Sequence, residues 1–301
     1  MSKGRKISPR QLRKLWAAYI EYRRPQVAPS TYARDYRAIS FRLTRMCAEL
    51  SYCRDAVAIR DWLLTAYSVD TTKRTLVQFS ACCKWAARSG QLAADPFAGF
   101  AAELRAPRPD PNAYRAFSTE ERDRIIAAID RHDPFFSPWV RFLFWTGCRP
   151  EEAAALRWQH VNLDCSRLMI WEAEPADTRL LQRTKNYRST DFPCNARLRL
   201  LLLSLLPAAP EPGLRVFRGR RSDYFNYIRF QTLHWRPVVM SLFDRGQLAF
   251  YGGQYHARHT WITMALQHLP IKDVAYLARV SPAVLLRHYA DRSREIDIPE
   301  F

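Results

Sequence analysis

Residues 144–158 read Phe-Trp-Thr-Gly-Cys-Arg-Pro-Glu-Glu-Ala-Ala-Ala-Leu-Arg-Trp, and this stretch organises the second half of the chain. It predicts a tight turn at Gly147 and then a helix that Pro150 opens, because proline is favoured at the first helical position. The residue before a proline is held out of helical geometry. Arg149 is therefore expected at the mouth of a helix, where backbone N–H groups favour an anion and a guanidinium can bind a phosphate. Taken alone, the pattern also fits an arginine in an ordinary salt bridge.

The charge of the chain points to a polyanionic partner. The 301 residues carry a net charge of +18, and the pI is about 10.0. Residues 1–100 hold 18 lysines and arginines against 7 acidic residues, so most of the excess lies in this third of the chain. Nucleic acid is the first candidate partner, and a basic ribosome- or membrane-associated protein stays open on charge alone.

The cysteine pattern indicates reduced thiols in a cytoplasmic protein. Seven cysteines are scattered without C-x-x-C spacing, so neither a disulfide framework nor a zinc site is expected. The basic N-terminus has no apolar run after it and is not a signal peptide. The most apolar stretch, residues 198–206, is too short to span a bilayer.

The chain is expected to fold as two domains. Residues 1–100 show apolar stripes at helical spacing, separated by caps such as Ser8 and Ser68, and predict an all-helical domain. Residues 101–113 carry prolines at three alternate positions and predict an extended linker.

Residues 114–301 are expected to form an α+β domain. A capping box at Ser118 and Glu121 starts its first helix. A strand is expected over 168–171 and a second extended piece over 180–193 with a turn near Asn186. The remaining expected helices cover 135–145, 198–206, 222–245 and 258–268, and a last helix carries Tyr289.

Two later segments of the sequence bear on the function of Arg149. Residues 255–261 read Tyr-His-Ala-Arg-His-Thr-Trp, and residues 281–291 read Ser-Pro-Ala-Val-Leu-Leu-Arg-His-Tyr-Ala-Asp. With residues 144–158, they resemble the signature of the tyrosine recombinases, the phage-integrase family. The resemblance spans about residues 8–293. It implies a helical, SAM-like core-binding domain and an α+β catalytic domain with a small antiparallel sheet.

The resemblance also implies roles for single residues. Tyr289 is the expected nucleophile, which would form a 3′-phosphotyrosyl link, and Arg149 and Arg258 would clamp the scissile phosphate. Lys185, in a Thr-Lys-Asn turn, would protonate the leaving 5′ oxygen. Neither metal nor ATP is required, because the phosphotyrosyl link conserves the bond energy. Without the other motifs, a core tyrosine would be the favoured interpretation of Tyr289. A solvated basic turn stays open as an alternative for the loop of Lys185.

Two positions depart from the family pattern. Tyr255 stands where the second motif usually has a histidine, and a phenol is a poor base at neutral pH. In the third motif, Ala278-Arg-Val-Ser281 replaces Leu-Gly-His-Ser, so either Arg279 or Val280 fills the histidine position. Arg279 there would be a third cationic donor to the phosphate, whereas Val280 would supply nothing. His259 is expected to pack or to support the site.

The expected partner is double-stranded DNA, bound by the recombinase as a tetramer through a Holliday junction, with a possible DNA-bending or directionality factor. No membrane partner is expected, and a bacterial nucleoid location follows from DNA binding. Hydroxyls and cations near helix starts and in the basic loops are candidate DNA contacts, although each threonine also fits a simple cap. They are Thr31, Arg34, Thr71, Thr72, Lys73, Arg74, Arg105, Arg108, Arg183 and Arg188.

Two other classes stay open. One is a type IB topoisomerase, which performs the same chemistry as a monomer. The other is a catalytically decayed DNA-binding or regulatory protein, which would bind DNA without forming an adduct.

Overall fold

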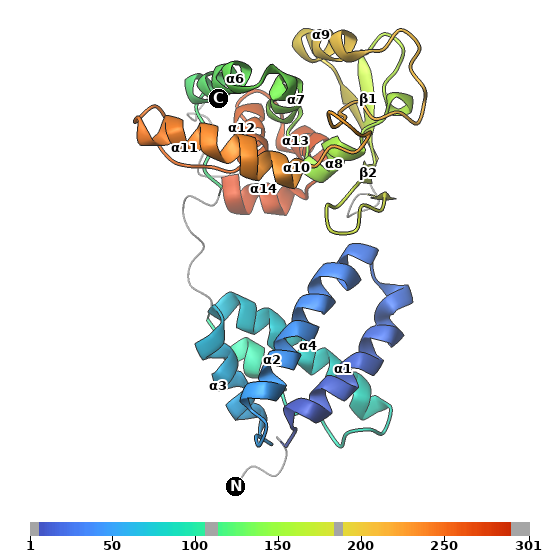
Figure 1. Cartoon of the computed structure of the whole chain (residues 1–301), viewed down its shortest axis with the longest axis vertical. Coiled ribbons are helices and arrows are strands. Elements are labelled where there is room, and N and C mark those ends of the chain that lie inside the picture. The colour runs from blue at the N-terminus through green and yellow to red at the C-terminus, as the bar shows by residue number, and fades with distance from the viewer. Residues whose placement is uncertain (1–5, 106–113, 184–188, 290–301) are drawn as a thin grey trace, which may run out of the picture. The chain divides into compact units, whose positions relative to one another are not determined.

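The computed structural model describes residues 6–105, 114–183 and 189–289. The chain divides into two compact units, Met1–Pro109 and Asp110–Phe301 (Figure 1). No helix in the described ranges combines the length and the apolar character that a membrane crossing requires.

The first unit is a bundle of helices. Its helices are α1 (Pro9–Arg23), α2 (Arg37–Glu49), α3 (Ala56–Ala66), α4 (Val69–Arg88) and α5 (Phe100–Glu103). Side chains of Ser8, Asp55 and Ser68 accept backbone N–H groups at the starts of α1, α3 and α4. α4 packs against α1, α3 and α5. The helical domain that the sequence predicts is therefore present.

The predicted start of the linker at residue 101 is wrong. α5 covers residues 100–103, and Phe100 is buried in the core of the helical unit. The Lys73 ammonium also donates to the carbonyl oxygen of Leu104 at 3.1 Å. Residues 100–104 therefore belong to the first unit, because an aromatic side chain and a hydrogen bond hold them there.

In the second unit, a small sheet region lies at one side of the helices, next to α8 (Pro150–Ala155) (Figure 1). The other helices are α6 (Thr119–His132), α7 (Ser137–Thr146), α9 (Ala196–Leu205), α10 (Tyr227–Phe230), α11 (Arg236–Asp244), α12 (His256–Ala265), α13 (Ile271–Ala278) and α14 (Pro282–Tyr289). The aromatic helix α7 is largely buried and packs against α6, α9 and α12. The helical run predicted over 222–245 begins only at Tyr227, because the Asn226 side chain caps α10 by accepting the Arg229 N–H.

The sheet region is antiparallel. β1 (Arg167–Ile170) pairs with β4 (Thr190–Pro193), and β2 (Glu172–Ala173) pairs with β3 (Gln182–Arg183). The predicted turn near Asn186 lies outside the described residues. β4 is tied to α13, because Thr190 Oγ1 donates to the Tyr276 carbonyl at 3.2 Å and the Asp191 N–H donates to the Tyr276 hydroxyl at 3.0 Å. The sheet thereby fixes the helix that leads to Arg279, and the predicted fold class is confirmed.

Candidate active site

The turn before Arg149 is shaped by Gly147. Its φ is +61°, and a Cβ there would lie 2.7 Å from the ring of Trp261, so this position requires glycine. Thr146 Oγ1 supports the turn, since it donates to the Phe142 carbonyl at 2.7 Å and accepts the Cys148 N–H at 3.2 Å. Arg149 then has extended backbone geometry directly before α8, as the sequence predicts.

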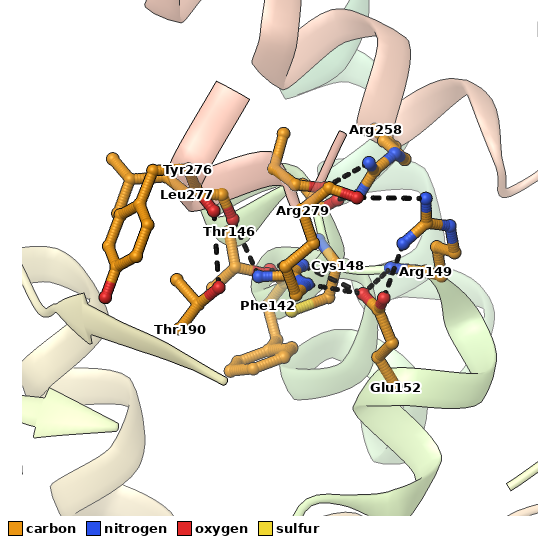
Figure 2. Close-up of polar contacts among 12 residues, drawn as sticks. Phe142, Thr146, Cys148, Arg149, Glu152, Thr190, Arg258, Tyr276, Leu277 and Arg279 are labelled. Carbon is orange, nitrogen blue, oxygen red and sulfur yellow. Dashed lines mark hydrogen bonds and ion pairs between the residues drawn. The ribbon is translucent and has the colours of Figure 1, made fainter. Parts of the chain in front are cut away.

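The anion at the start of α8 is the carboxylate of Glu152. This side chain is buried and accepts the Arg149 N–H at 2.9 Å and the Arg149 Nη1 at 2.6 Å. It also accepts Nε and Nη2 of Arg279 at 3.1 and 2.8 Å (Figure 2). The helix mouth that the sequence left open for an external anion is therefore filled by the protein's own carboxylate.

Three guanidinium groups determine the ionisation of Glu152. Burial would raise the pKa of this carboxyl, but Arg279, Arg149 and Arg258 outweigh it and hold the pKa at about 2. Glu152 is thus ionised at any physiological pH. Its single negative charge offsets only part of the positive charge of the three guanidinium groups.

Arg258, on α12, is held by backbone carbonyls. Its Nη1 donates to the Gly147 carbonyl at 2.8 Å, and its Nη2 donates to the carbonyl of Ala278. Burial, and then the neighbouring charge of Arg149, lower the pKa of Arg258 to about 10. The group still carries its charge at neutral pH, so it is a desolvated cation beside Arg149 (Figure 2).

The structure corrects the role expected of Arg279. Its φ is +54°, so the residue ends α13 in a left-handed cap, and this turns its side chain into the protein. The guanidinium contacts Glu152, the Leu277 carbonyl at 2.6 Å and Cys148 Sγ at 3.6 Å, and it is almost fully buried. It therefore supports the cluster from inside, which argues against direct contact with a phosphate. The half-buried Val280 packs against a small apolar cluster and offers no polar group in its place.

The backbone carbonyl groups of residues 278 and 279 accept hydrogen bonds from the other two arginines, Arg258 and Arg149. Ala278 accepts from Arg258, and the Arg279 carbonyl accepts Nη2 of Arg149 at 3.4 Å. The end of α13 thus orients both guanidinium groups. Arg149 keeps about a fifth of its side chain exposed, so it can meet a ligand from solvent.

Tyr289 is the last residue of α14 that the structure describes, and its side chain is only 3% exposed. Its hydroxyl forms a hydrogen bond with Nδ1 of His259 on α12. The ring of Tyr114 stacks on His288 at 3.9 Å and lies edge-on to Tyr289 at 5.9 Å. The candidate nucleophile is therefore covered by aromatic rings and held by a histidine.

Tyr255 lies between the two parts of the site. It is 41% exposed, and its ring lies 5.3 Å from that of His259. Burial, the largest effect on both groups, acts to lower the pKa of Arg149 and of Arg258, and Tyr255 lies close enough to act in the opposite direction on each. A chain of contacts thus runs from Tyr289 through His259 and Tyr255 to the arginines.

The comparisons identify the architecture. No protein-family model matches the sequence, and no curated protein matches it. Among solved structures, the Tn1549 transposon integrase in complex with a circular intermediate DNA superposes with a TM-score of 0.76 at 14% identity, covering 92% of this chain and 94% of that one. A lambda integrase dimer bound to a COC' core site gives 0.65 at 14% identity, covering 95% and 98%. The chain has the tyrosine-recombinase fold.

A lambda integrase tetramer bound to a Holliday junction shares this fold, with a TM-score of 0.61 at 13% identity over 88% of this chain and 76% of that one. Of the positions that the tyrosine-recombinase resemblance selected, Arg149, Arg258 and Arg279 come together around Glu152. Tyr255 and Tyr289 meet at His259. Lys185, Arg188 and Arg108 lie outside the described residues.

The candidate DNA contacts of the helical unit differ in accessibility. Arg34 and Arg74 are exposed and pair with Asp35 and Asp70, both at 2.9 Å. The prediction for Thr72 is wrong, because its side chain is fully buried and its hydroxyl donates to the Leu63 carbonyl at 2.9 Å. Lys73 is engaged with Leu104. Thr31 and Thr71 are half-buried, and Arg105, like Arg183 of the second unit, is exposed.

Sequence reasoning assigned no role to Glu152 or Tyr114 and did not predict the contact between His259 and Tyr289. Glu152 could have been found from its place three residues after Arg149, the residue before α8, where a carboxylate reaches back to the backbone. Tyr114 and the His259–Tyr289 contact carried no local signal, because the contact joins residues 30 positions apart.

Proposed function

We propose that the protein is a site-specific tyrosine recombinase that cleaves and rejoins DNA through a phosphotyrosine. The observation that carries the proposal is the pair Arg149 and Arg258, which share the carbonyl-lined turn at residues 147 and 278–279. Two adjacent forks suit the non-bridging oxygens of one phosphate. The buried Tyr289 is tied to the same helix, α12, as Arg258.

The proposed reaction needs no energy source. The Tyr289 oxygen attacks phosphorus and the bond to the 5′ oxygen breaks, which leaves a 3′-phosphotyrosyl link and a 5′-hydroxyl. Arg149 and Arg258 stabilise the charge of the pentacoordinate transition state. Lys185 supplies the proton of the leaving oxygen. A 5′-hydroxyl of a partner strand then reverses the step, so that neither ATP nor a metal takes part.

The proposed assembly follows the DNA-bound neighbours. Four protomers on two duplexes would exchange strands in pairs through a Holliday junction in the cytoplasm, for integration or excision of a mobile element. The surplus of positive charge in residues 1–100 supports binding of the helical unit to the phosphate backbone.

A covalent trap tests the proposal. The protein is incubated with fragmented DNA from its own genomic neighbourhood and quenched with detergent, and the ends of protein-linked DNA are sequenced. Adducts at one inverted-repeat site, absent with Tyr289→Phe, are expected. Tight binding without adducts would favour a decayed DNA-binding protein. Relaxation of supercoiled DNA by dilute protein would favour a type IB topoisomerase.

A further inference from the structure

We infer that His259 takes the proton from the Tyr289 hydroxyl when this tyrosine attacks DNA, and so fills the role that Tyr255 cannot. The inference rests on the proposed function and names the base for its first step. It starts from one contact, the hydrogen bond between Tyr289 Oη and His259 Nδ1.

The contact is enclosed on both sides. His259 is 6% exposed and Tyr289 is 3% exposed. Tyr114 lies edge-on to the His259 ring at 5.1 Å and to the Tyr289 ring at 5.9 Å. A hydrogen bond from which water is excluded is strengthened and keeps one geometry, as proton transfer in a fixed direction requires.

The other titratable groups around His259 are less suited to the role. Tyr255 is 41% exposed, and a phenol is a poor base at neutral pH. The ring of His256 lies 5.4 Å from His259 and packs against Phe250 at 5.5 Å. His288 stacks on Tyr114. Among the histidines in the described part of the chain, His259 is the one whose ring nitrogen forms a hydrogen bond with the Tyr289 hydroxyl.

The position of His259 also links the base to the phosphate clamp. It follows Arg258 directly on α12, and Arg258 is fixed by the carbonyls of Gly147 and Ala278. One helix turn therefore carries both the group that holds the phosphate and the group that holds the attacking hydroxyl. Fixed spacing between them orients the nucleophile toward phosphorus.

The step balances as follows. A neutral His259 accepts the phenolic proton at Nδ1 and becomes an imidazolium, while the Tyr289 oxygen forms its bond to phosphorus. The bond from phosphorus to the 5′ oxygen breaks, and that oxygen takes a proton from Lys185. In the rejoining step the imidazolium returns its proton to the Tyr289 oxygen as the 5′-hydroxyl attacks.

Two variants separate proton transfer from positioning. His259→Phe keeps the packing and removes the acceptor, whereas His259→Asn keeps an acceptor that is not basic. We expect both to slow adduct formation by about 10²-fold or more at the site recovered in the trap. His288→Phe is the matched control, because it removes a neighbouring histidine while keeping a ring against Tyr114, and it should cleave at the wild-type rate. Near wild-type rates for His259→Asn, or for both variants, would overturn the assignment as a base.

A substrate with sulfur in place of the scissile 5′ bridging oxygen shows whether a variant impairs deprotonation of the nucleophile or protonation of the leaving group. A thiolate leaves without a proton, so this substrate should restore a Lys185→Ala variant and leave the His259 variants slow. Restoration of the His259 variants would place the histidine on the leaving-group side and overturn the inference.

A measurement without DNA tests the contact itself. With 3-fluorotyrosine at position 289, the fluorine resonance should differ between wild-type protein and His259→Phe, because the variant removes the hydrogen bond to the tyrosine hydroxyl. An unchanged resonance would refute the hydrogen bond. If wild-type protein forms no adduct on any DNA, the proposed function and the base both fall, while the resonance still decides whether His259 holds the hydroxyl.

Discussion

At the scale of single residues, the site is governed by one buried carboxylate among three guanidinium groups. Glu152 bonds to Arg149 and Arg279, and its low pKa reflects these charges together with that of Arg258. A buried ion that loses a partner is strongly destabilising, because the remaining charge stays desolvated. The proposed phosphate clamp therefore depends on residues that need not touch DNA.

Acid should weaken the protein through Glu152. Its pKa is about 2 in the folded protein and 4.5 in a free side chain, so its stabilisation is complete above pH 4.5 and is lost as the pH falls toward 2. Urea unfolding at several pH values should show Glu152→Gln less stable than wild type at pH 7 and with a shallower loss between pH 4.5 and 2. Parallel curves for the two proteins would contradict the ion cluster.

Arg149→Lys should lose most cleavage activity, by about 10²-fold or more, while the protein stays folded. A lysine keeps the charge but cannot bond Glu152, the Arg279 carbonyl and a phosphate oxygen with one planar fork. The rate of adduct formation measures the effect, and the control is Arg199→Lys, at an exposed arginine of α9 that pairs with Asp164. Near-normal cleavage by Arg149→Lys would contradict the proposal that Arg149 binds the scissile phosphate.

Arg279→Gly separates backbone from side chain. Glycine favours the left-handed φ of this position, worth about 1 kcal/mol, but the change removes the buried partner of Glu152, which costs about 3–5 kcal/mol. We expect a net loss of about 2–4 kcal/mol in the free energy of unfolding. A variant as stable as wild type would show that the Glu152 contact contributes little.

At the scale of elements, the site is assembled where short segments end. The α7–α8 turn supplies Arg149, the end of α13 supplies two carbonyls, and β4 fixes α13 through Tyr276. α12 carries Arg258 and His259 between them. Small shifts in one terminus would move a guanidinium, so the rigidity of these ends matters for activity.

Gly147→Ala tests the turn, with Gly90→Ala as a matched control. Both glycines have positive φ, but only at Gly147 would the added Cβ meet a neighbour, the ring of Trp261 at 2.7 Å. We expect Gly90→Ala to cost about 1 kcal/mol and Gly147→Ala about 1–3 kcal/mol more, with loss of cleavage. Thermal unfolding and adduct formation measure this, and equal costs for the two variants would refute the packing argument.

At the scale of the whole molecule, the dominant feature is the net charge of +18. Most phosphate contacts are independent of sequence and release counterions. The affinity for DNA should therefore depend on charge, and cleavage should depend on the arginine cluster and Tyr289.

Binding to a random duplex should fall by about 10³-fold or more between 50 and 200 mM salt. Tyr289→Phe should show the same affinity and the same salt dependence, because the tyrosine is buried and carries no charge. Fluorescence anisotropy at several salt concentrations measures both proteins. A flat salt response would contradict binding through the phosphate backbone.

The sequence predicted much of the fold and part of the site, for reasons that can be named. Helix caps such as Ser8, Ser68 and Ser118 are local signals, and the structure forms each of them. The strand near residue 168 is present as β1. The linker does not begin at residue 101 as predicted, because α5 continues to residue 103 and Leu104 packs against the core of the helical unit.

What the sequence by itself determined is the order of elements, the concentration of charge, and the residue types that the tyrosine-recombinase chemistry requires. The first two follow from local spacing and composition, and the third follows from the resemblance to the tyrosine recombinases. Only the tertiary structure decided that Arg279 faces Glu152, 127 residues away, and that His259 holds the hydroxyl of Tyr289. The physical reason is that the direction of a buried side chain depends on its backbone φ and on its partners. Folding brings those partners together from distant parts of the chain.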